Sequence, residues 1–122
     1  MAKLLIVDDE GDIREFASSF FRRRKITCFT ASNGEEALEL AAKHTPDLIL
    51  LDVMMAGIDG IETLRRLKEW DPACKVIMVT GREPQEQDAF DTCQRLGALA
   101  YVHKPLELDE LERVVLQEIS SV

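Results

Sequence analysis

The stretch from Asp47 to Asp52 reads DLILLD and places four consecutive apolar residues between two carboxylates. An apolar run without alternation is typical of a strand buried on both faces, as strands are in a parallel sheet. Such a strand would deliver Asp52 to the edge of the sheet. Because Asp is also a common turn residue after a strand, Asp52 by itself does not separate a functional group from ordinary turn chemistry.

Around this stretch the chain alternates strands with helices. Apolar and β-branched runs predict further strands at residues 3–7, 26–31, 75–79 and 98–102. Helical spacing and capping residues predict helices at 12–24, from Asn33 to about 44, after Asp59, from 84 or 85 to 95, and over the last 15 or so residues. Five strands and five helices in alternation predict an α/β fold, a doubly wound parallel sheet with helices on both faces.

Apolar side chains three or four residues apart define the faces of the helices that we expect to turn inward. The fourth helix has sparse apolar positions, so we expect it to bury little surface and to be easily displaced. The expected inward residues are Ile13, Phe16, Ala17, Phe20 and Phe21, then Ala37, Leu38 and Ala41, then Ile61, Leu64 and Leu67, then Ala89, Phe90 and Cys93, and finally Leu108, Leu111, Val114, Val115 and Ile119.

Length and composition indicate one globular domain covering residues 1–122, with 46% hydrophobic residues for its core. No leader, long apolar run or low-complexity linker is visible, so we expect a cytoplasmic protein that binds no membrane. A net charge of −8 argues against nucleic-acid binding by this chain. The three cysteines lack the spacing of a zinc or redox motif and are expected to be reduced, partly buried thiols.

Polar and charged groups end four of the predicted strands, and a parallel sheet would bring them to one edge. They are Asp8 and Asp9, Asp52, Thr80 and Lys104. Three crowded carboxylates repel one another by about 4 kcal/mol per pair at 4 Å, so the site should hold a cation. Mg²⁺ fits best, because it prefers oxygen ligands and combines carboxylates with water and phosphate oxygens.

An acidic pair, a separate carboxylate, a lysine and a hydroxyl together favour phosphoryl transfer to Asp52. Lys104 and the metal would neutralise charge on the phosphoryl oxygens, and Thr80 would supply a hydroxyl. Gly81 matters here because a side chain at that position would crowd the incoming group.

These residues give the chain a resemblance to the receiver domains of two-component response regulators over essentially its full length. The matching segments are Val7-Asp8-Asp9-Glu10, Leu51-Asp52 with Met54, Met55, Asp59 and Gly60, Thr80-Gly81, and Lys104-Pro105. The resemblance implies the flavodoxin-like, CheY-like fold with strand order 2-1-3-4-5. It also implies a phosphorylation-activated switch that acts on a partner or output domain through the fourth helix, fifth strand and last helix.

Further roles come from the resemblance alone. Asp52 would accept a phosphoryl group from a histidine kinase or a histidine phosphotransfer protein. Asp9, Asp52 and the backbone carbonyl of Met54 would bind Mg²⁺, with Asp8 acting directly or through water. Lys104 would pair with Asp52 and then with the phosphoryl group, and its bond to Pro105 is expected to be cis. Tyr101 would change from an outward to an inward position as Thr80 moves.

Three positions bear on how the family pattern applies here. The family usually carries proline four residues after the phosphoacceptor, where this chain has Ala56, so we expect a modestly looser loop. Met54 and Arg82 occupy positions at which the family tunes the access of water to the acyl phosphate. Their bulk can slow or redirect hydrolysis, and the sequence assigns no direction.

Two other classes of protein fit these residues less well. A phosphatase of the haloacid dehalogenase type needs a second Asp where this chain has Met54, and a flavodoxin-like nucleotide or flavin binder would place its anion against Asp8, Asp9 and Glu10. A phosphorylation-independent interaction module with the same fold remains the alternative. The sequence also leaves open whether the chain acts alone or belongs to a longer regulator. We expect no turnover enzyme, only self-catalysed phosphorylation and dephosphorylation.

Overall fold

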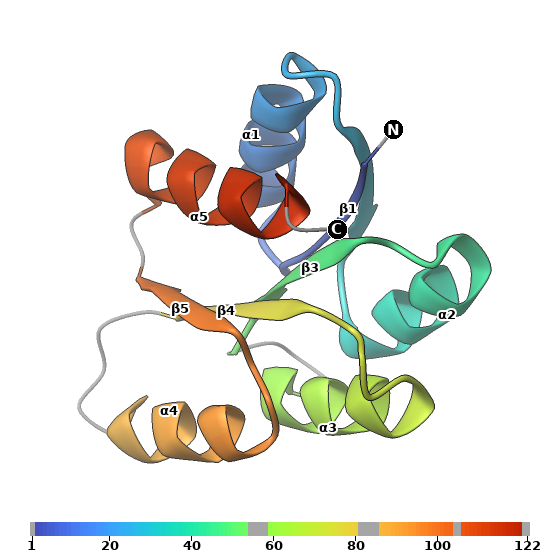
Figure 1. The fold of residues 1–122 in the computed structure, drawn as a ribbon, viewed down its shortest axis with the longest axis vertical. Helices are drawn as coiled ribbons and strands as arrows, with labels where there is room; N and C mark the ends of the chain where they lie inside the picture. Colours follow the sequence, from blue (N-terminus) through green and yellow to red (C-terminus); the bar gives the residue numbers. More distant parts are fainter. Residues whose placement is uncertain (1, 54–58, 81–85, 104–105, 121–122) are drawn as a thin grey trace.

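Five strands and five helices alternate along the chain in the computed structural model, which describes residues 2–53, 59–80, 86–103 and 106–120 (Figure 1). The strands are β1 (Lys3–Val7), β2 (Thr27–Ala31), β3 (Leu48–Asp52), β4 (Val76–Thr80) and β5 (Ala100–His103). The helices are α1 (Gly11–Arg22), α2 (Gly34–His44), α3 (Gly60–Trp70), α4 (Glu86–Arg95) and α5 (Leu108–Ser120).

The strands form one parallel sheet in the order β2-β1-β3-β4-β5, so the expected fold class and strand order are confirmed. The order reverses at β1, which pairs with β2 on one side and β3 on the other. All five residues of β3, from Leu48 to Asp52, are buried. The stretch from Leu48 to Asp52 is therefore the central strand of the sheet. It lies next to the point where ligands bind in open α/β sheets.

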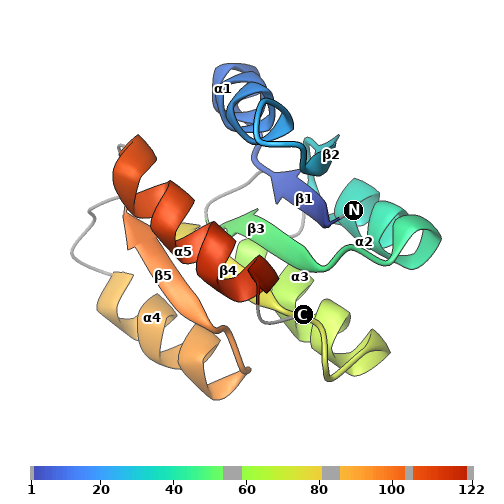
Figure 2. The same ribbon diagram turned by 45° about the horizontal axis from the view of Figure 1, so that its top comes forward.

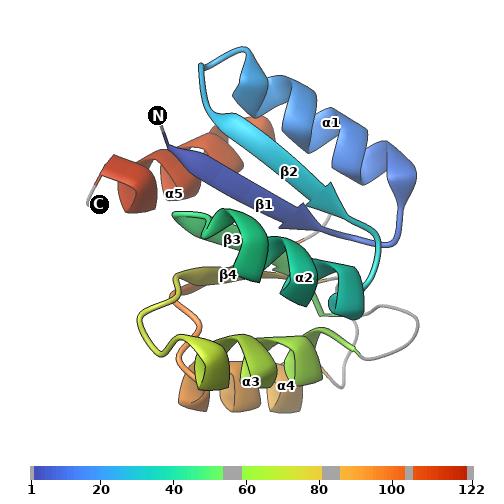
Figure 3. The same ribbon diagram turned by 90° about the vertical axis from the view of Figure 1, so that its right-hand side faces the viewer.

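Two apolar layers enclose the sheet, because successive strand residues point to opposite faces. Leu4, Ile6 and Leu50 pack in the layer beneath α1 and α5. Leu5, Val7, Ile49 and Leu51 pack in the layer beneath α2, α3 and α4. Figures 2 and 3 show this division, with α1 and α5 on one side of the sheet and the other three helices on the opposite side.

The predicted inward orientation is wrong for two side chains. The side chain of Phe16 is 44% exposed, because α1 turns Ala17 and Phe21 toward the sheet and leaves Phe16 beside them at the surface. Leu108 is 37% exposed, since it begins α5 before the helix reaches the buried Leu111.

The start of β5 also differs from the prediction, which placed it at residue 98. Gly97 has a φ of 100°, and the amide of Ala98 donates to the carbonyl of Cys93 at 3.0 Å. These two features close the end of α4. The strand consequently begins at Ala100.

Local hydrogen bonds begin α2 and α3 as the sequence predicts. The Asn33 side chain accepts from the amide of Glu36 at 2.8 Å, and the Asp59 side chain accepts from the amide of Glu62 at 2.8 Å. The Glu62 carboxylate also pairs with Arg65 and Arg66, which lowers the pKa of Glu62 to about 2. The cap at Asp59 fixes where α3 starts, directly after the segment that follows β3.

The cysteines are buried and unpaired, as predicted, and should be unreactive in the folded protein. Burial raises the pKa of all three thiols, in the case of Cys74 to about 11. At pH 8 the reactive thiolate is therefore scarce as well as inaccessible. We expect negligible reaction with Ellman's reagent in native buffer and release of three equivalents in denaturant. Fast reaction of the folded protein would contradict this burial.

Candidate functional site

Asp8 and Asp52 reach the carboxyl edge of the sheet from neighbouring strands. Asp52 is the last residue of β3, and Asp8 directly follows β1, where its amide donates to the carbonyl of Ala31 in β2 at 3.1 Å. Asp8 is 2% exposed and Asp52 is 3% exposed. Two buried carboxylates at one place are costly unless a cation or hydrogen-bond donors compensate their charge.

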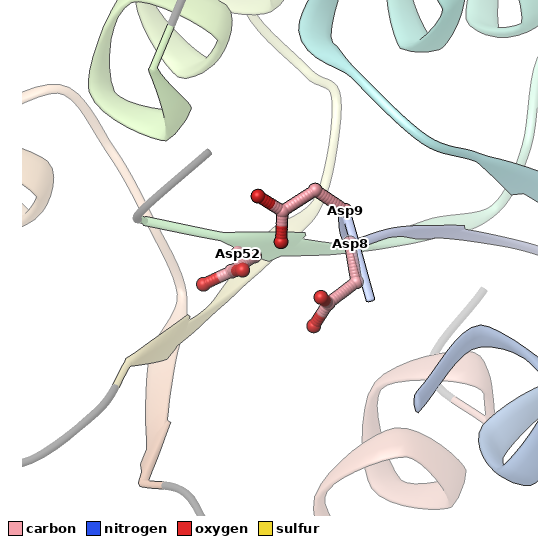
Figure 4. A group of neighbouring side chains, drawn as sticks. All are labelled: Asp8, Asp9 and Asp52. Carbon is pink, nitrogen blue, oxygen red and sulfur yellow. The ribbon is translucent and has the colours of Figure 1, made fainter. Parts of the chain in front are cut away.

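Asp9 completes the group from the solvent side. One carboxylate oxygen from each of Asp8, Asp9 and Asp52 can be chosen so that all three lie within 4.8 Å of one another. Figure 4 shows Asp9 reaching from the end of β1 toward Asp52, with Asp8 beside it. The structure therefore brings together the three carboxylates that the sequence singled out.

The spacing of these oxygens fits a small hard cation. Mg²⁺ binds oxygen at about 2.1 Å, so ligands on opposite sides of the ion lie about 4.2 Å apart. Three carboxylate oxygens within 4.8 Å need only small adjustments to reach that geometry. Among the described residues the group contains carboxylates and neither His nor Cys, which favours Mg²⁺ over softer metals.

The backbone at Asp8 is held by two further interactions. The Asp8 carboxylate accepts from the amide of Glu10 at 2.9 Å, and the Asp8 carbonyl accepts from a guanidinium nitrogen of Arg14 at 2.7 Å. The sequence reasoning missed Arg14. Its position on the first turn of the helix that follows Asp8 was the available signal, since that turn lies directly over the end of β1.

We expect Arg14→Gln to weaken Mg²⁺ binding without removing a ligand. The shorter neutral side chain loses the charge-assisted bond to the Asp8 carbonyl, so the turn that carries Asp8 and Asp9 is held less firmly. Loss of such outer contacts costs about tenfold or more in metal affinity. Isothermal titration with MgCl₂ measures the change, and Arg113→Gln on the exposed surface of α5 is the matched control. Equal affinity in the two variants would remove Arg14 from the site.

Gly60 determines how closely α3 approaches the end of β3. Its amide donates to the carbonyl of Val53 at 2.9 Å. A Cβ atom at Gly60 would lie 2.1 Å from the carbonyl oxygen of Asp52 and 2.7 Å from the Cα of Val53. Both neighbours are backbone atoms that cannot rotate away. The glycine therefore allows the contact that positions Asp52.

The remaining predicted site residues are described in part. Thr80 ends β4 and pairs with His103, the last residue of β5, so both strands reach the edge of the sheet that carries Asp52. The side chain of Thr80 lies outside the described part of the structure. So do several complete residues on which predictions were made, namely Met54, Ala56, Gly81, Arg82, Lys104 and Pro105.

Tyr101 lies in β5 opposite Met78 of β4 and is half-buried. Its hydroxyl oxygen is fully buried, and its ring packs against the apolar layer that includes Cys93 of α4. Burial raises the pKa of the Cys93 thiol, and a hydrogen bond with Tyr101 acts in the opposite direction. Tyr101 thus joins β5 to α4, a neighbour that the sequence reasoning did not identify.

The sequence of the chain is similar to a known domain family and to known proteins. Residues 4–116 match the family model described as the response regulator receiver domain. The chain is 40% identical to the sporulation initiation phosphotransferase F of Bacillus subtilis, over 93% of the chain and 90% of that protein. It is 36% identical to the DNA-binding transcriptional regulator NtrC of Escherichia coli over 94% of the chain, which spans only 24% of that regulator.

Solved structures share the fold over nearly the whole chain. A response regulator receiver domain protein from Clostridium thermocellum superposes with a TM-score of 0.91 and 26% identity, covering 99% of this chain and 96% of that one. The response regulator TrrA from Thermotoga maritima, solved in complex with Mg²⁺-BeF, gives a TM-score of 0.85 and 32% identity, with coverage of 97% and 99%.

Proposed function

The chain belongs to the response regulator receiver domain family of two-component systems, and we propose that residues 1–122 form one receiver domain whose phosphoacceptor is Asp52. The observation that carries this proposal is the convergence of Asp8, Asp9 and Asp52 at the carboxyl edge of the sheet. Of the three, only Asp52 belongs to the central strand itself. Its backbone is held on both sides, by pairing with Val79 and by the close approach of Gly60.

Asp52 would act as the nucleophile of a phosphoryl transfer. A carboxylate oxygen of Asp52 forms a bond to phosphorus as the bond from phosphorus to the imidazole nitrogen of a phosphohistidine breaks, which leaves an acyl phosphate and a free imidazole. Asp8, Asp9 and Asp52 would hold Mg²⁺, together with the carbonyl of Met54. The bound ion would supply positive charge to the phosphoryl oxygens.

Lys104, Thr80 and Gly81 complete the proposed site. The Lys104 ammonium would pair with the phosphoryl group, the Thr80 hydroxyl would hydrogen-bond to it, and Gly81 would leave room for it. A cis bond between Lys104 and Pro105 belongs to the same proposal. The pairing of Thr80 with His103 supports the proposed place of Lys104. His103 ends β5 at the edge of the sheet that carries Asp52, and Lys104 is the next residue in the chain.

The output would be a change of the surface formed by α4, β5 and α5. Movement of Thr80 toward the phosphoryl group would alter the space beside Tyr101, and Tyr101 already packs with Cys93 of α4. Inverting a two-state population from 1:99 to 99:1 requires a differential stabilisation of roughly 5.5 kcal/mol. A new dianionic group that is bound by a metal and a lysine in one state only is a source of that size.

The partners would be a histidine kinase or histidine phosphotransfer protein and a downstream target or output domain, without nucleic acid or membrane bound by this chain. Its phosphorylation chemistry would act on the chain itself, so we propose a switch and no turnover enzyme. We further propose that this switch is cytoplasmic. None of the described helices combines the length and apolar character needed to cross a bilayer.

Incubation with labelled acetyl phosphate tests the phosphorylation. We expect incorporation that requires Mg²⁺, is prevented by EDTA, and maps to the peptide that contains Asp52. Beryllofluoride with Mg²⁺ should then shift the backbone NMR resonances of α4, β5 and α5. Labelling confined to another peptide would reassign the acceptor.

The alternative is an interaction module that keeps the fold and works without phosphorylation. It predicts no incorporation from acetyl phosphate and no effect of beryllofluoride. It also predicts the same binding of a given partner in phosphorylating and non-phosphorylating conditions. The three intact carboxylates argue against this alternative. Their mutual repulsion costs free energy, and a module that binds neither metal nor phosphoryl group gains nothing that offsets it.

A further inference from the structure

A polar groove lies between α1 and β2. Its volume is about 350 Å³, within the range of small-molecule sites. The groove is lined by Gly11, Arg14, Glu15, Ser18, Ser19 and Arg22 of α1 and by Thr30 of β2. Of these residues only Arg14 also contacts the acidic site, through the carbonyl of Asp8.

The two arginines of the groove are held in place by the backbone. Arg14 donates to the carbonyl of Asp8 at 2.7 Å, and Arg22 donates to the carbonyl of Cys28 at 3.1 Å. Each of these bonds uses one of the five N–H donors of a guanidinium, which leaves donors that can face a ligand. The residues that line the groove carry two pre-positioned cations against one carboxylate, that of Glu15, in a chain whose net charge is −8.

The spacing of the arginines places positive charge at both ends of the groove. Arg14 and Arg22 are eight residues apart on α1, about 12 Å along the axis at 1.5 Å per residue. Their anchor points agree with this distance. Asp8 bonds to Ala31, three residues along β2 from Cys28, which is about 10 Å of strand. A single compact anion would reach only one of the two guanidiniums closely.

The middle of the groove carries groups suited to hydroxyls. The Glu15 carboxylate is an acceptor, and the hydroxyls of Ser19 and Thr30 can donate or accept. Within the described part of the chain these two hydroxyls make no side-chain hydrogen bond, so they are available to a ligand. Ser18 is 3% exposed and donates to the carbonyl of Glu15 at 3.3 Å.

We propose that this groove binds an elongated polyol with a phosphate group at each end, of the hexose bisphosphate class. Arg14 and Arg22 bind the two phosphates, and Glu15, Ser19 and Thr30 bind the hydroxyls between them. Arginine is suited to the ends because its planar fork binds phosphate oxygens in pairs. This inference stands apart from the phosphorylation of Asp52.

Titration with fructose 1,6-bisphosphate, followed by ¹H–¹⁵N NMR in EDTA, tests the site without metal-mediated binding at the carboxylates. We expect saturable shifts of amides in α1 and β2 with a Kd below about 1 mM. Fructose 6-phosphate, with one anionic end, should bind at least about tenfold more weakly. Absence of saturable shifts in this region, or equal affinity for the two sugars, would overturn the proposal.

Variants identify the groups that bind. Arg22→Gln should weaken binding of the bisphosphate at least about tenfold, and the control Arg113→Gln should leave it unchanged. The pair Ser19→Ala and Thr30→Val removes two hydroxyls without touching the arginine anchors, and should weaken binding about threefold to tenfold. Affinity that survives both the charge and the hydroxyl variants would exclude this groove.

Discussion

Asp52→Asn is expected to abolish phosphoryl incorporation from acetyl phosphate. The amide nitrogen and oxygen that replace the carboxylate provide no anionic nucleophile, and neither Asp8 nor Asp9 lies on the central strand where the incoming group is proposed to bind. Mass spectrometry of the intact protein after incubation with Mg²⁺ and acetyl phosphate measures the result. Incorporation at the wild-type level in this variant would remove Asp52 as the phosphoacceptor.

The same substitution should reduce the stabilisation of the protein by Mg²⁺. A ligand at 100 times its Kd stabilises the folded state by about 2.7 kcal/mol, and a lost carboxylate ligand raises the Kd. We therefore expect the Mg²⁺-dependent rise in Tm to become smaller or disappear in Asp52→Asn. Asp109→Asn, which removes an exposed carboxylate from the first turn of α5, is the matched control and should behave as wild type. An unchanged Mg²⁺ effect in Asp52→Asn would show that the ion binds elsewhere.

Gly60→Ala is expected to be the most destabilising small substitution near the site. The added methyl group would stand 2.1 Å from the carbonyl oxygen of Asp52, so either α3 or the end of β3 must move. Forced backbone shifts of this kind cost about 3 kcal/mol, a large share of a typical stability of 5 to 15 kcal/mol. Urea denaturation measures the loss in the free energy of unfolding.

Gly11→Ala provides the control for this prediction. A Cβ atom there would have its nearest contact at 3.4 Å, an ordinary van der Waals distance from the Arg14 guanidinium, and alanine favours the helix. We expect it to be neutral or slightly stabilising. Gly60→Ala should also weaken Mg²⁺ binding, because Asp52 moves with the end of β3. Equal stability of the two variants would mean that the contact at Gly60 relaxes without cost.

The proximity of Tyr101 to Cys93 illustrates what local patterns miss. Each residue was recognised separately, one as a half-buried strand aromatic and the other as a buried thiol. Their contact depends on how α4 lies against β5, and the sparse apolar residues of α4 do not determine that packing. The same holds for Arg14, whose bond to Asp8 arises only when α1 folds back over the end of β1.

The sequence by itself determined the elements, their parallel arrangement and the acidic site. The apolar run before Asp52 is typical of a buried strand, and in a parallel sheet of alternating strands and helices the carboxyl ends of β1 and β3 lie at one edge. Asp8, Asp9 and Asp52 were predictable for this reason, because covalent position after a strand fixes where a side chain must lie.

Tertiary packing decided the contacts that no periodicity specifies. The orientation of α1 leaves Phe16 exposed, and the close approach of α3 to β3 requires glycine at position 60. The packing of α1 against β2 forms the groove between Arg14 and Arg22. Each depends on the angle and depth at which a helix meets the sheet. This angle and depth depend on the combined volumes of many side chains from distant segments. A local sequence pattern does not specify how those side chains pack together.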